Sequence, residues 1–209
     1  MQLAPPHGPL AGPWRQLCRA YLALAGWRVV SPWPDIPKMV LVAAPHTSNW
    51  DGINMLAAAG FYRVKLRWIG KASLVRGPFG GLVRWLGCVP VERGAPDGIV
   101  AAMAAAFAEI DRMVLAIPPE GTRDRVDAWK TGYYQIALAA GVPIVMSVLD
   151  YGTKTIRIEG PVIPTGDYEA DRAAIEAPYA QAVGRDPGRF APPRTGRSDA
   201  AAPPGSPGP

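Results

Sequence analysis

Apolar residues follow two alternating patterns from Lys38 to Ile158 of this 209-residue chain. Short continuous apolar runs predict buried strands, and stretches in which apolar residues recur every three or four positions predict helices. The predicted strands cover 39–44, 64–69, 88–91, 113–117, 142–149 and 153–158, the last as an edge strand. The predicted helices cover 51–59, 82–86, 97–112 and 133–140. This alternation predicts an α/β fold with a mainly parallel central sheet covered by helices.

The two ends of the chain differ in composition from this middle part. Residues 1–13 are rich in proline and glycine, and the segment after Gly184 combines many prolines with few large apolar residues. Segments of this kind bury too little apolar surface to offset the entropy of ordering them. We therefore predict an N-terminal segment over 1–35, one folded domain over 36–184 and a disordered tail over 185–209.

Within the N-terminal segment, apolar residues at helical spacing predict a short helix over 14–27. Three tryptophans (Trp14, Trp27 and Trp33) and three arginines precede residue 34, and no acidic residue precedes Asp35. Because tryptophan favours the membrane interface and arginine attracts anionic headgroups, these residues predict an interfacial helix. The alternative is a helix that only packs on the domain. No apolar run reaches about 18 residues, so no transmembrane helix is predicted.

Charge along the chain is unevenly placed, although the formal net charge is only +5. Residues 52–91 contain no acid and six basic residues: Arg63, Lys65, Arg67, Lys71, Arg76 and Arg84. This favours an anionic partner such as a lipid headgroup, a phosphate or a nucleic acid, and a solvated basic face is an equal alternative. Two cysteines without metal-type spacing indicate a reducing cytosolic setting. Two histidines exclude a multi-histidine metal centre.

His46 lies just after the predicted strand over 39–44, in the loop A-P-H-T-S-N-W-D-G. Parallel α/β folds usually place their sites in such loops, at the carboxyl ends of strands. Asp51 can hold one nitrogen of the imidazole ring as a donor, which leaves the other nitrogen to accept a hydroxyl proton. The alternative is structural, because Ser48 and Asp51 also match a capping box that begins a helix.

A second loop, I-P-P-E-G-T-R over 117–123, follows another predicted strand. Gly121 and the neighbouring backbone N–H groups can cradle an anion, and Arg123 can bind two phosphate oxygens at once. The alternative is a polar turn in which Glu120 and Arg123 pair with each other. Lys71 is a further candidate for an anion contact, because it follows the predicted strand over 64–69.

Nucleophilic catalysis has no support in the sequence. The chain lacks a G-x-S-x-G elbow, and Cys88 lies inside a predicted strand. A nucleotide-binding P-loop around Gly70-Lys71 is excluded as well. Lys65 and Ala72 stand where that motif requires a glycine and a serine or threonine.

Taken in order, four blocks of the chain resemble those of the glycerolipid acyltransferase family, typified by 1-acylglycerol-3-phosphate acyltransferase. His46 and Asp51 match the His-x4-Asp block, and residues 87–93 are similar to a second block that ends in arginine. Residues 119–123 match the P-E-G-T-R block, and residues 141–145 are similar to the V-P-I-V block. Each block alone is weak, but the ordered set is a specific signal.

The resemblance implies direct transfer of a fatty acyl group from an acyl thioester to a hydroxyl of a lysophospholipid such as 1-acylglycerol-3-phosphate. The donor would be acyl-CoA or acyl carrier protein, and no metal or cofactor would be needed. His46 would act as the general base, oriented by Asp51. The acceptor's phosphate and glycerol would be bound by Arg93, Glu120, Gly121, Thr122 and Arg123, with Lys71 as an added contact.

This reading also implies a cytoplasmic protein that lies peripherally on the inner face of a membrane. No nucleic acid is expected as a partner, since the chain contains no recognisable nucleic-acid-binding module. The alternative function is a non-catalytic module of the same fold that binds lipid or a membrane surface.

Overall fold

The computed structural model describes residues 10–91 and 96–192. The helices are α1 (Ala11–Leu24), α2 (Asn49–Tyr62), α3 (Ser73–Arg76), α4 (Gly80–Trp85), α5 (Pro96–Glu109), α6 (Gly132–Ala140) and α7 (Tyr168–Glu176). The strands are β1 (Arg28–Val29), β2 (Lys38–Ala44), β3 (Leu66–Lys71), β4 (Cys88–Val91), β5 (Met113–Ile117), β6 (Ile144–Asp150) and β7 (Thr155–Val162). Two 3-10 turns, η2 (Ala177–Tyr179) and η3 (Pro187–Arg189), follow α7.

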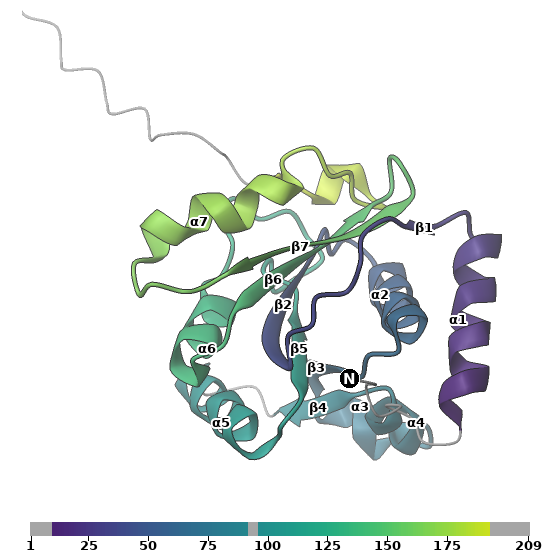
Figure 1. The fold of residues 1–209 in the computed structure, drawn as a ribbon, viewed down its shortest axis with the longest axis horizontal. Helices are drawn as coiled ribbons and strands as arrows, with labels where there is room; N and C mark the ends of the chain where they lie inside the picture. Colours follow the sequence, from purple (N-terminus) through teal and green to yellow (C-terminus); the bar gives the residue numbers. More distant parts are fainter. Residues whose placement is uncertain (1–9, 92–95, 193–209) are drawn as a thin grey trace, which may run out of the picture.

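In the described part of the chain, the strands form one seven-stranded sheet in the order β1-β7-β6-β2-β5-β3-β4 (Figure 1). Every neighbouring pair is parallel except β6 and β7, which form an antiparallel pair. The mainly parallel α/β fold predicted from the sequence is therefore confirmed. The predicted edge position of the last strand is wrong, because Arg28 and Val29 pair with Thr155 and Ile156 and so cover that edge of β7.

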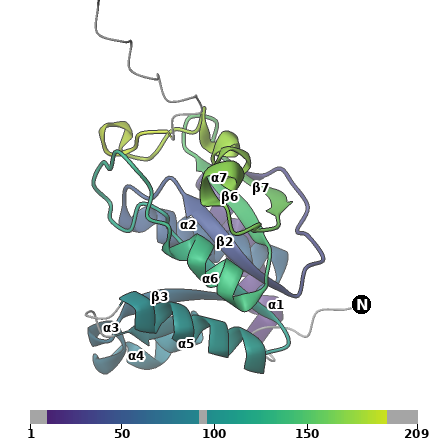
Figure 2. The ribbon, with the colours of Figure 1, turned by 90° about the vertical axis from the view of Figure 1, so that its left-hand side faces the viewer.

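Strand β2 lies at the centre of the fold and divides the core into two layers. Its residues from Met39 to Ala44 are all buried, as expected for a parallel strand covered on both faces. Met39 and Leu41 face the layer that contains α2, and Val40 and Val42 face the layer that contains α5 and α6. Figure 2 shows α5 and α6 lying side by side across the second of these faces.

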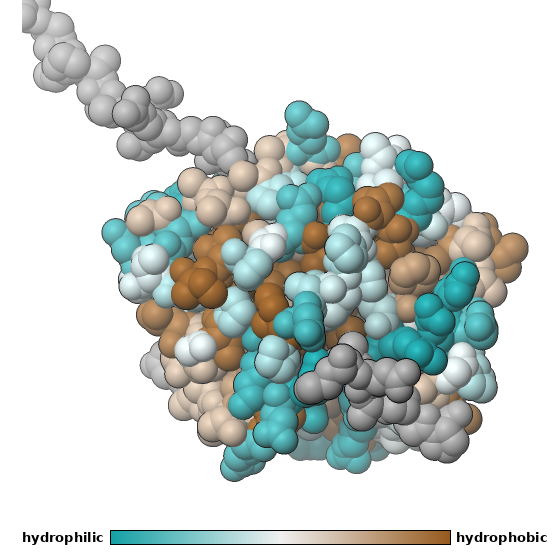
Figure 3. Space-filling view, viewed as in Figure 1, coloured by the Kyte–Doolittle hydropathy of each residue, from teal (hydrophilic) through white to brown (hydrophobic). Residues whose placement is uncertain are grey.

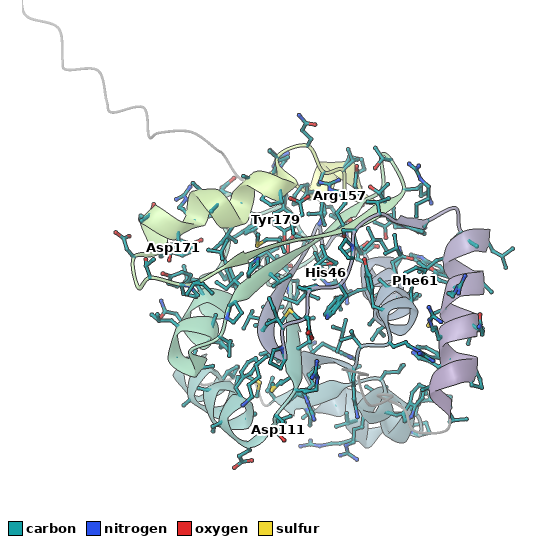
Figure 4. All side chains as sticks on the ribbon, viewed as in Figure 1. His46, Phe61, Asp111, Arg157, Asp171 and Tyr179 are labelled. Atoms are coloured by element: carbon teal, nitrogen blue, oxygen red, sulfur yellow. The ribbon has the colours of Figure 1, made fainter. Side chains whose placement is uncertain are left out.

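Helix α1 does not contact the sheet through most of its length but packs on the outer side of α2 (Figure 1). Cys18 is so close to α2 that a Cβ on Gly60 would lie 2.3 Å from its sulfur, so glycine is what permits the approach. Arg15 Nε also donates to the carbonyl of Phe61 at 3.3 Å. Figure 4 shows Phe61 between the two helices.

The predicted role in membrane insertion does not fit Trp27, which is buried, whereas Trp14 and Trp33 are partly exposed. Trp27 is 6% exposed and lies edge-on against Tyr151, with ring centroids 4.8 Å apart. Trp14 packs against Trp85 in the same way. Trp33 also packs on the domain, against Tyr62.

The apolar residues that α1 turns to solvent are leucines instead: Leu10, Leu17 and Leu24 are 56%, 61% and 90% exposed. Figure 3 shows apolar atoms at the right-hand edge of the molecule, over the C-terminal end of α1. No helix of the described residues is both long and apolar enough to cross a membrane.

Several parts of the fold lie outside the predicted elements, among them the strand β1 and the short helix α3. Helix α7 was not predicted; it begins at Asp167, whose carboxylate accepts the backbone N–H of Ala170 at 3.1 Å. The predicted tail starts too early, because Phe190 is buried in the core together with Tyr179. The proline-rich composition of this segment predicted disorder, but the single aromatic residue Phe190 anchors it to the core. Residues 193–209 of the predicted tail lie outside the described residues.

Candidate active site

The motif loop that carries the predicted base and the loop that carries the P-E-G-T-R block meet at one edge of the sheet. Strands β2 and β5 are parallel neighbours, so the loops that follow them leave the same edge side by side. The loop after β2 carries His46, and the loop after β5 carries Glu120. Glu120 Oε1 accepts the backbone N–H of His46 at 2.9 Å, and this hydrogen bond joins the two loops directly.

His46 and Asp51 lie next to each other, as the spacing predicts. The Nδ1 atom of His46 is 3.8 Å from Oδ2 of Asp51, close enough for an ion pair and longer than a hydrogen bond. The His46 side chain is 24% exposed and that of Asp51 is 2% exposed. In Figure 4, His46 lies between the sheet and α2. The ring therefore presents one nitrogen to a buried carboxylate and lies partly open to solvent.

Asp51 also has the structural role that the capping-box alternative predicts. Its Oδ2 accepts the backbone N–H groups of Thr47 and Ser48, each at 2.6 Å, and its Oδ1 accepts the Ser48 hydroxyl at 3.0 Å. These bonds begin α2 and fold the His46 loop over the first turn of that helix. The structural and the catalytic interpretations of Asp51 are therefore compatible.

The electrostatic surroundings keep the His46 ring neutral near pH 7. Burial lowers the pKa of His46 below the usual 6.5, and the charge of Arg123 lowers it further. The carboxylate of Asp51 acts in the opposite direction and raises this pKa. A neutral imidazole is the form that can accept a proton.

Glu120 lies beneath the loops rather than in the wall of the pocket. It is 4% exposed, and its second oxygen, Oε2, has no hydrogen-bond partner among the described residues. Burial raises the pKa of Glu120 to about 7, although the hydrogen bond from His46 favours the charged form. The predicted alternative of a Glu120–Arg123 ion pair does not occur in the described part of the chain.

A pocket of about 1180 Å³ opens beside His46 and brings together most of the predicted site residues. His46 and Asp51 line it together with four basic side chains, Lys71, Arg123, Lys130 and Arg189, and with Gly121, Thr122 and Asp124. Gly121 has a positive φ of 65°, and a Cβ there would lie 2.8 Å from the Lys130 side chain. Glycine therefore lets Lys130 cross the loop and reach the pocket.

Much of the remaining lining of this pocket is apolar. This part is formed by side chains from α2, β3, α5 and α6: Ile53, Met55, Leu56, Trp68, Ile69, Ile99, Val100 and Ile136. The pocket thus combines cationic side chains, which can bind phosphate oxygens, with apolar side chains suited to a hydrocarbon chain.

The segment after η2 borders the site, which the sequence did not predict. The backbone N–H of Asp186 donates to the Thr47 hydroxyl at 3.2 Å, and the Arg185 guanidinium lies over the Trp50 ring at 5.1 Å. Arg189 lies 3.9 Å from Asp124, which follows the P-E-G-T-R block. These contacts connect the C-terminal segment to both motif loops and add Arg189 to the pocket wall.

The predicted residues thus divide into three groups. His46, Asp51, Lys71, Gly121, Thr122 and Arg123 line one pocket, and Glu120 is buried next to it. Arg93 lies outside the described residues. Arg189 and Tyr151 were not predicted. Tyr151 lies just after the end of a predicted strand, and this position could have identified it as a candidate site residue. Nothing in the sequence around Arg189 distinguishes it from the other arginines of the predicted tail.

Comparison with known proteins places the chain in a family. The family described as Acyltransferase matches residues 34–149, which include both motif loops. The chain belongs to this acyltransferase family. It is 34% identical over 108 residues to the 1-acyl-sn-glycerol-3-phosphate acyltransferase of Salmonella typhimurium, and 34% identical over 109 residues to that of Escherichia coli.

Each of these alignments covers 49% of this chain and 43% of the relative, so the match spans less than half the length of the curated relatives. The crystal structure of the 1-acyl-sn-glycerophosphate acyltransferase PlsC from Thermotoga maritima aligns with 80% of this chain and 79% of its own. The TM-score is 0.53 and the sequence identity is 16%, which shows a common fold.

Proposed function

We propose that this acyltransferase-family chain transfers a fatty acyl group from an acyl thioester to the free hydroxyl of a lysophospholipid such as 1-acylglycerol-3-phosphate. The observation that carries the proposal is the placement of His46. Its ring has a buried carboxylate on one side, and the ring lines a pocket whose wall also carries Arg123 and Lys71. A base beside an anion-binding surface fits an acceptor that has a hydroxyl close to a phosphate.

In the proposed reaction, the acceptor hydroxyl oxygen attacks the thioester carbonyl while His46 takes the hydroxyl proton. Asp51, on the Nδ1 side of the ring, stabilises the imidazolium that forms. Collapse of the tetrahedral intermediate breaks the carbon–sulfur bond, and the proton on His46 passes to the departing thiolate. Oxygen acylation and release of a free thiol balance the reaction without a covalent acyl-enzyme, a metal or a cofactor.

Within the proposed acceptor site, Arg123 supplies the forked contact to phosphate oxygens, and Lys71 supplies a second positive charge. Gly121 and Thr122 bring backbone close to the ligand at the turn with positive φ. Glu120 supports the site from below, because its carboxylate fixes the backbone at His46.

We further propose that the acyl chain lies along the apolar wall between α2 and α5. Trp68 and Ile69 form the base of this wall, and Ile53 lies at a partly exposed position on α2. Burial of each methylene there contributes about 0.8 kcal/mol, so long chains gain most of their affinity from this wall.

Peripheral contact with an anionic membrane is proposed to occur through α1. Leu10, Leu17 and Leu24 are seven residues apart and so lie on nearly the same side of the helix, all of them exposed. Exposed basic side chains also occur in the first half of the fold, including Arg19 and Arg28, whereas the described acids of residues 10–91 are the exposed Asp35 and the buried Asp51. Apolar insertion and charge attraction would therefore act together, on the cytoplasmic side.

The alternative of a non-catalytic binding module predicts lipid binding without turnover. Incubation with acyl-CoA, or with acyl carrier protein carrying an acyl group, and a panel of lysolipids distinguishes the two by mass spectrometry of the products. We expect a diacylated phospholipid, formed fastest from a phosphorylated acceptor. Lipid binding with no product from either donor would establish the alternative.

A further inference from the structure

Asp51 receives a fourth hydrogen bond from a part of the chain far away in sequence. Its other three donors belong to its own loop, at Thr47 and Ser48. The fourth is the hydroxyl of Tyr151, 100 residues further on, which donates to Oδ1 at 2.5 Å. Tyr151 follows the end of β6, the strand that pairs with β2 on the side opposite to β5. The loop of a third strand thus reaches the His46–Asp51 pair.

Tyr151 is itself held in place by a directed chain of polar contacts. Asn54 Nδ2 donates to the Tyr151 hydroxyl oxygen at 2.9 Å, so the hydroxyl proton is left to point at Asp51. The side-chain oxygen Oδ1 of Asn54 in turn accepts a hydrogen bond from the hydroxyl of Tyr21, on α1, at 2.8 Å. Asn54 is 2% exposed, which makes loss of either bond costly. The Tyr151 ring is fixed by its edge-on contact with Trp27.

We propose that Tyr151, oriented by Asn54 and Tyr21, is a positioning residue that fixes the carboxylate of Asp51 opposite the ring of His46. The inference rests on the proposed function. The backbone donors hold Oδ2 on the side of His46, and Tyr151 holds Oδ1 on the far side, so the carboxylate cannot rotate about its Cβ–Cγ bond. Tyr151 also withdraws negative charge from Asp51 and so moderates its effect on His46.

The charged groups around His46 and Asp51 determine how removal of the Tyr151 hydroxyl changes the pKa of His46. Arg123 lowers the pKa of His46 and Asp51 raises it, while the charge of Asp51 also raises the pKa of Glu120. On the outer side, Arg185 acts on Tyr21. Tyr151→Phe changes none of these charges and keeps the ring on Trp27. It leaves more negative charge on Asp51, 3.8 Å from His46.

Tyr151→Phe should therefore raise the pKa of His46, by about half a pH unit if the lost bond has ordinary strength. The measurement is an NMR titration of the histidine ring protons, which is simple because the chain contains two histidines and His7→Ala assigns the other signal. The acid limb of the pH–rate profile should move upward with it. We expect kcat to fall about tenfold with KM for both substrates unchanged.

Two further variants separate positioning from folding. Tyr62→Phe is the matched control, because its hydroxyl donates to the carbonyl of Ser31 away from the site; it should leave the titration and kcat unchanged. Tyr21→Phe removes the outer end of the chain and should shift the His46 pKa in the same direction by less. If Tyr151→Phe does not fold, Tyr21→Phe carries the test.

An unchanged or lowered His46 pKa in both Tyr151→Phe and Tyr21→Phe would overturn the proposal. Equal effects of Tyr62→Phe would assign the change to general loss of stability and overturn it as well. The NMR readout does not require turnover. A protein that transfers no acyl group but shows the shift would refute the proposed function and retain the coupling of Tyr151 to His46.

Discussion

Glu120 and His46 are joined by a hydrogen bond from the backbone of one to the carboxylate of the other, 2.9 Å long. This bond connects the loop after β5 with the loop after β2. The family resemblance implies a role for Glu120 in the acceptor site; in the structure Glu120 is buried next to the pocket, and its carboxylate holds the backbone of the His46 loop. The two motif loops are thus held together by a direct hydrogen bond.

His46→Ala should reduce acyl transfer by at least about 100-fold, which is the lower end of a general-base contribution. The protein should stay folded, because the side chain is partly exposed and the bond to Glu120 uses the backbone of His46. Activity is measured as product formation by mass spectrometry, with His7→Ala as the matched control. A folded His46→Ala protein with full activity would refute the mechanism.

The acid limb of kcat/KM should have its midpoint below pH 6.5, because burial and Arg123 lower the pKa of His46 and only the neutral ring accepts a proton. Asp51→Asn keeps an oxygen for the cap of α2 but removes the charge that raises this pKa. The limb should therefore move to still lower pH while kcat falls. A limb that stays in place in Asp51→Asn would show that Asp51 does not act on the base.

Arg123→Ala should weaken use of the phosphorylated acceptor by roughly 10- to 150-fold, the range of one charge-assisted contact. Hydrolysis of the acyl thioester by water, with no acceptor present, should change little. Arg125→Ala is the matched control, since this exposed arginine lies two residues further on and outside the pocket wall. Equal losses in both reactions would indicate a structural role for Arg123. Arg93→Ala should behave like Arg123→Ala.

Glu120→Gln should stabilise the protein at high pH. Burial raises the pKa of Glu120 from 4.5 to about 7, so the wild-type protein loses stability as the pH rises through this interval. The glutamine variant has no such loss, and its advantage should reach about 3 kcal/mol above pH 7 and vanish below pH 4.5. Melting curves at pH 4, 6 and 8 measure the difference. A constant difference in melting temperature would contradict the buried, unpaired state of this carboxyl.

Leu17→Ser and Leu24→Ser should each weaken binding to anionic vesicles, by about tenfold if the side chain inserts fully. Leu138→Ser is the matched control, because it removes an exposed leucine from α6, on the opposite side of the sheet. High salt should weaken binding only in part, since insertion is not screened.

Trp27→Ala should act differently from these leucine variants. It should lower the melting temperature, because Trp27 is buried against Tyr151, and it should leave vesicle binding of the folded protein unchanged. Vesicle binding that depends on Trp27 and not on Leu17 or Leu24 would contradict the proposed surface.

Except for the short helix α3, the amino-acid sequence by itself determined the order of strands and helices from β2 to β6, and with it the positions of the motif loops. These features depend on local periodicity, which sidechain burial imposes wherever a strand has two covered faces or a helix has one. The proximity of the His46 and Glu120 loops followed as well, because parallel strands place their carboxyl ends at the same edge.

Only the tertiary structure decided which contacts cross long stretches of sequence. Two residues, Arg28 and Val29, form an edge strand that is too short to have a pattern, and they exist as a strand only because β7 offers its edge. Trp27 packs inward because α2 and Tyr151 provide an apolar surface for it. Tyr151 reaches Asp51 across 100 residues. Such pairings depend on how distant elements dock, and the local sequence pattern carries no record of that geometry.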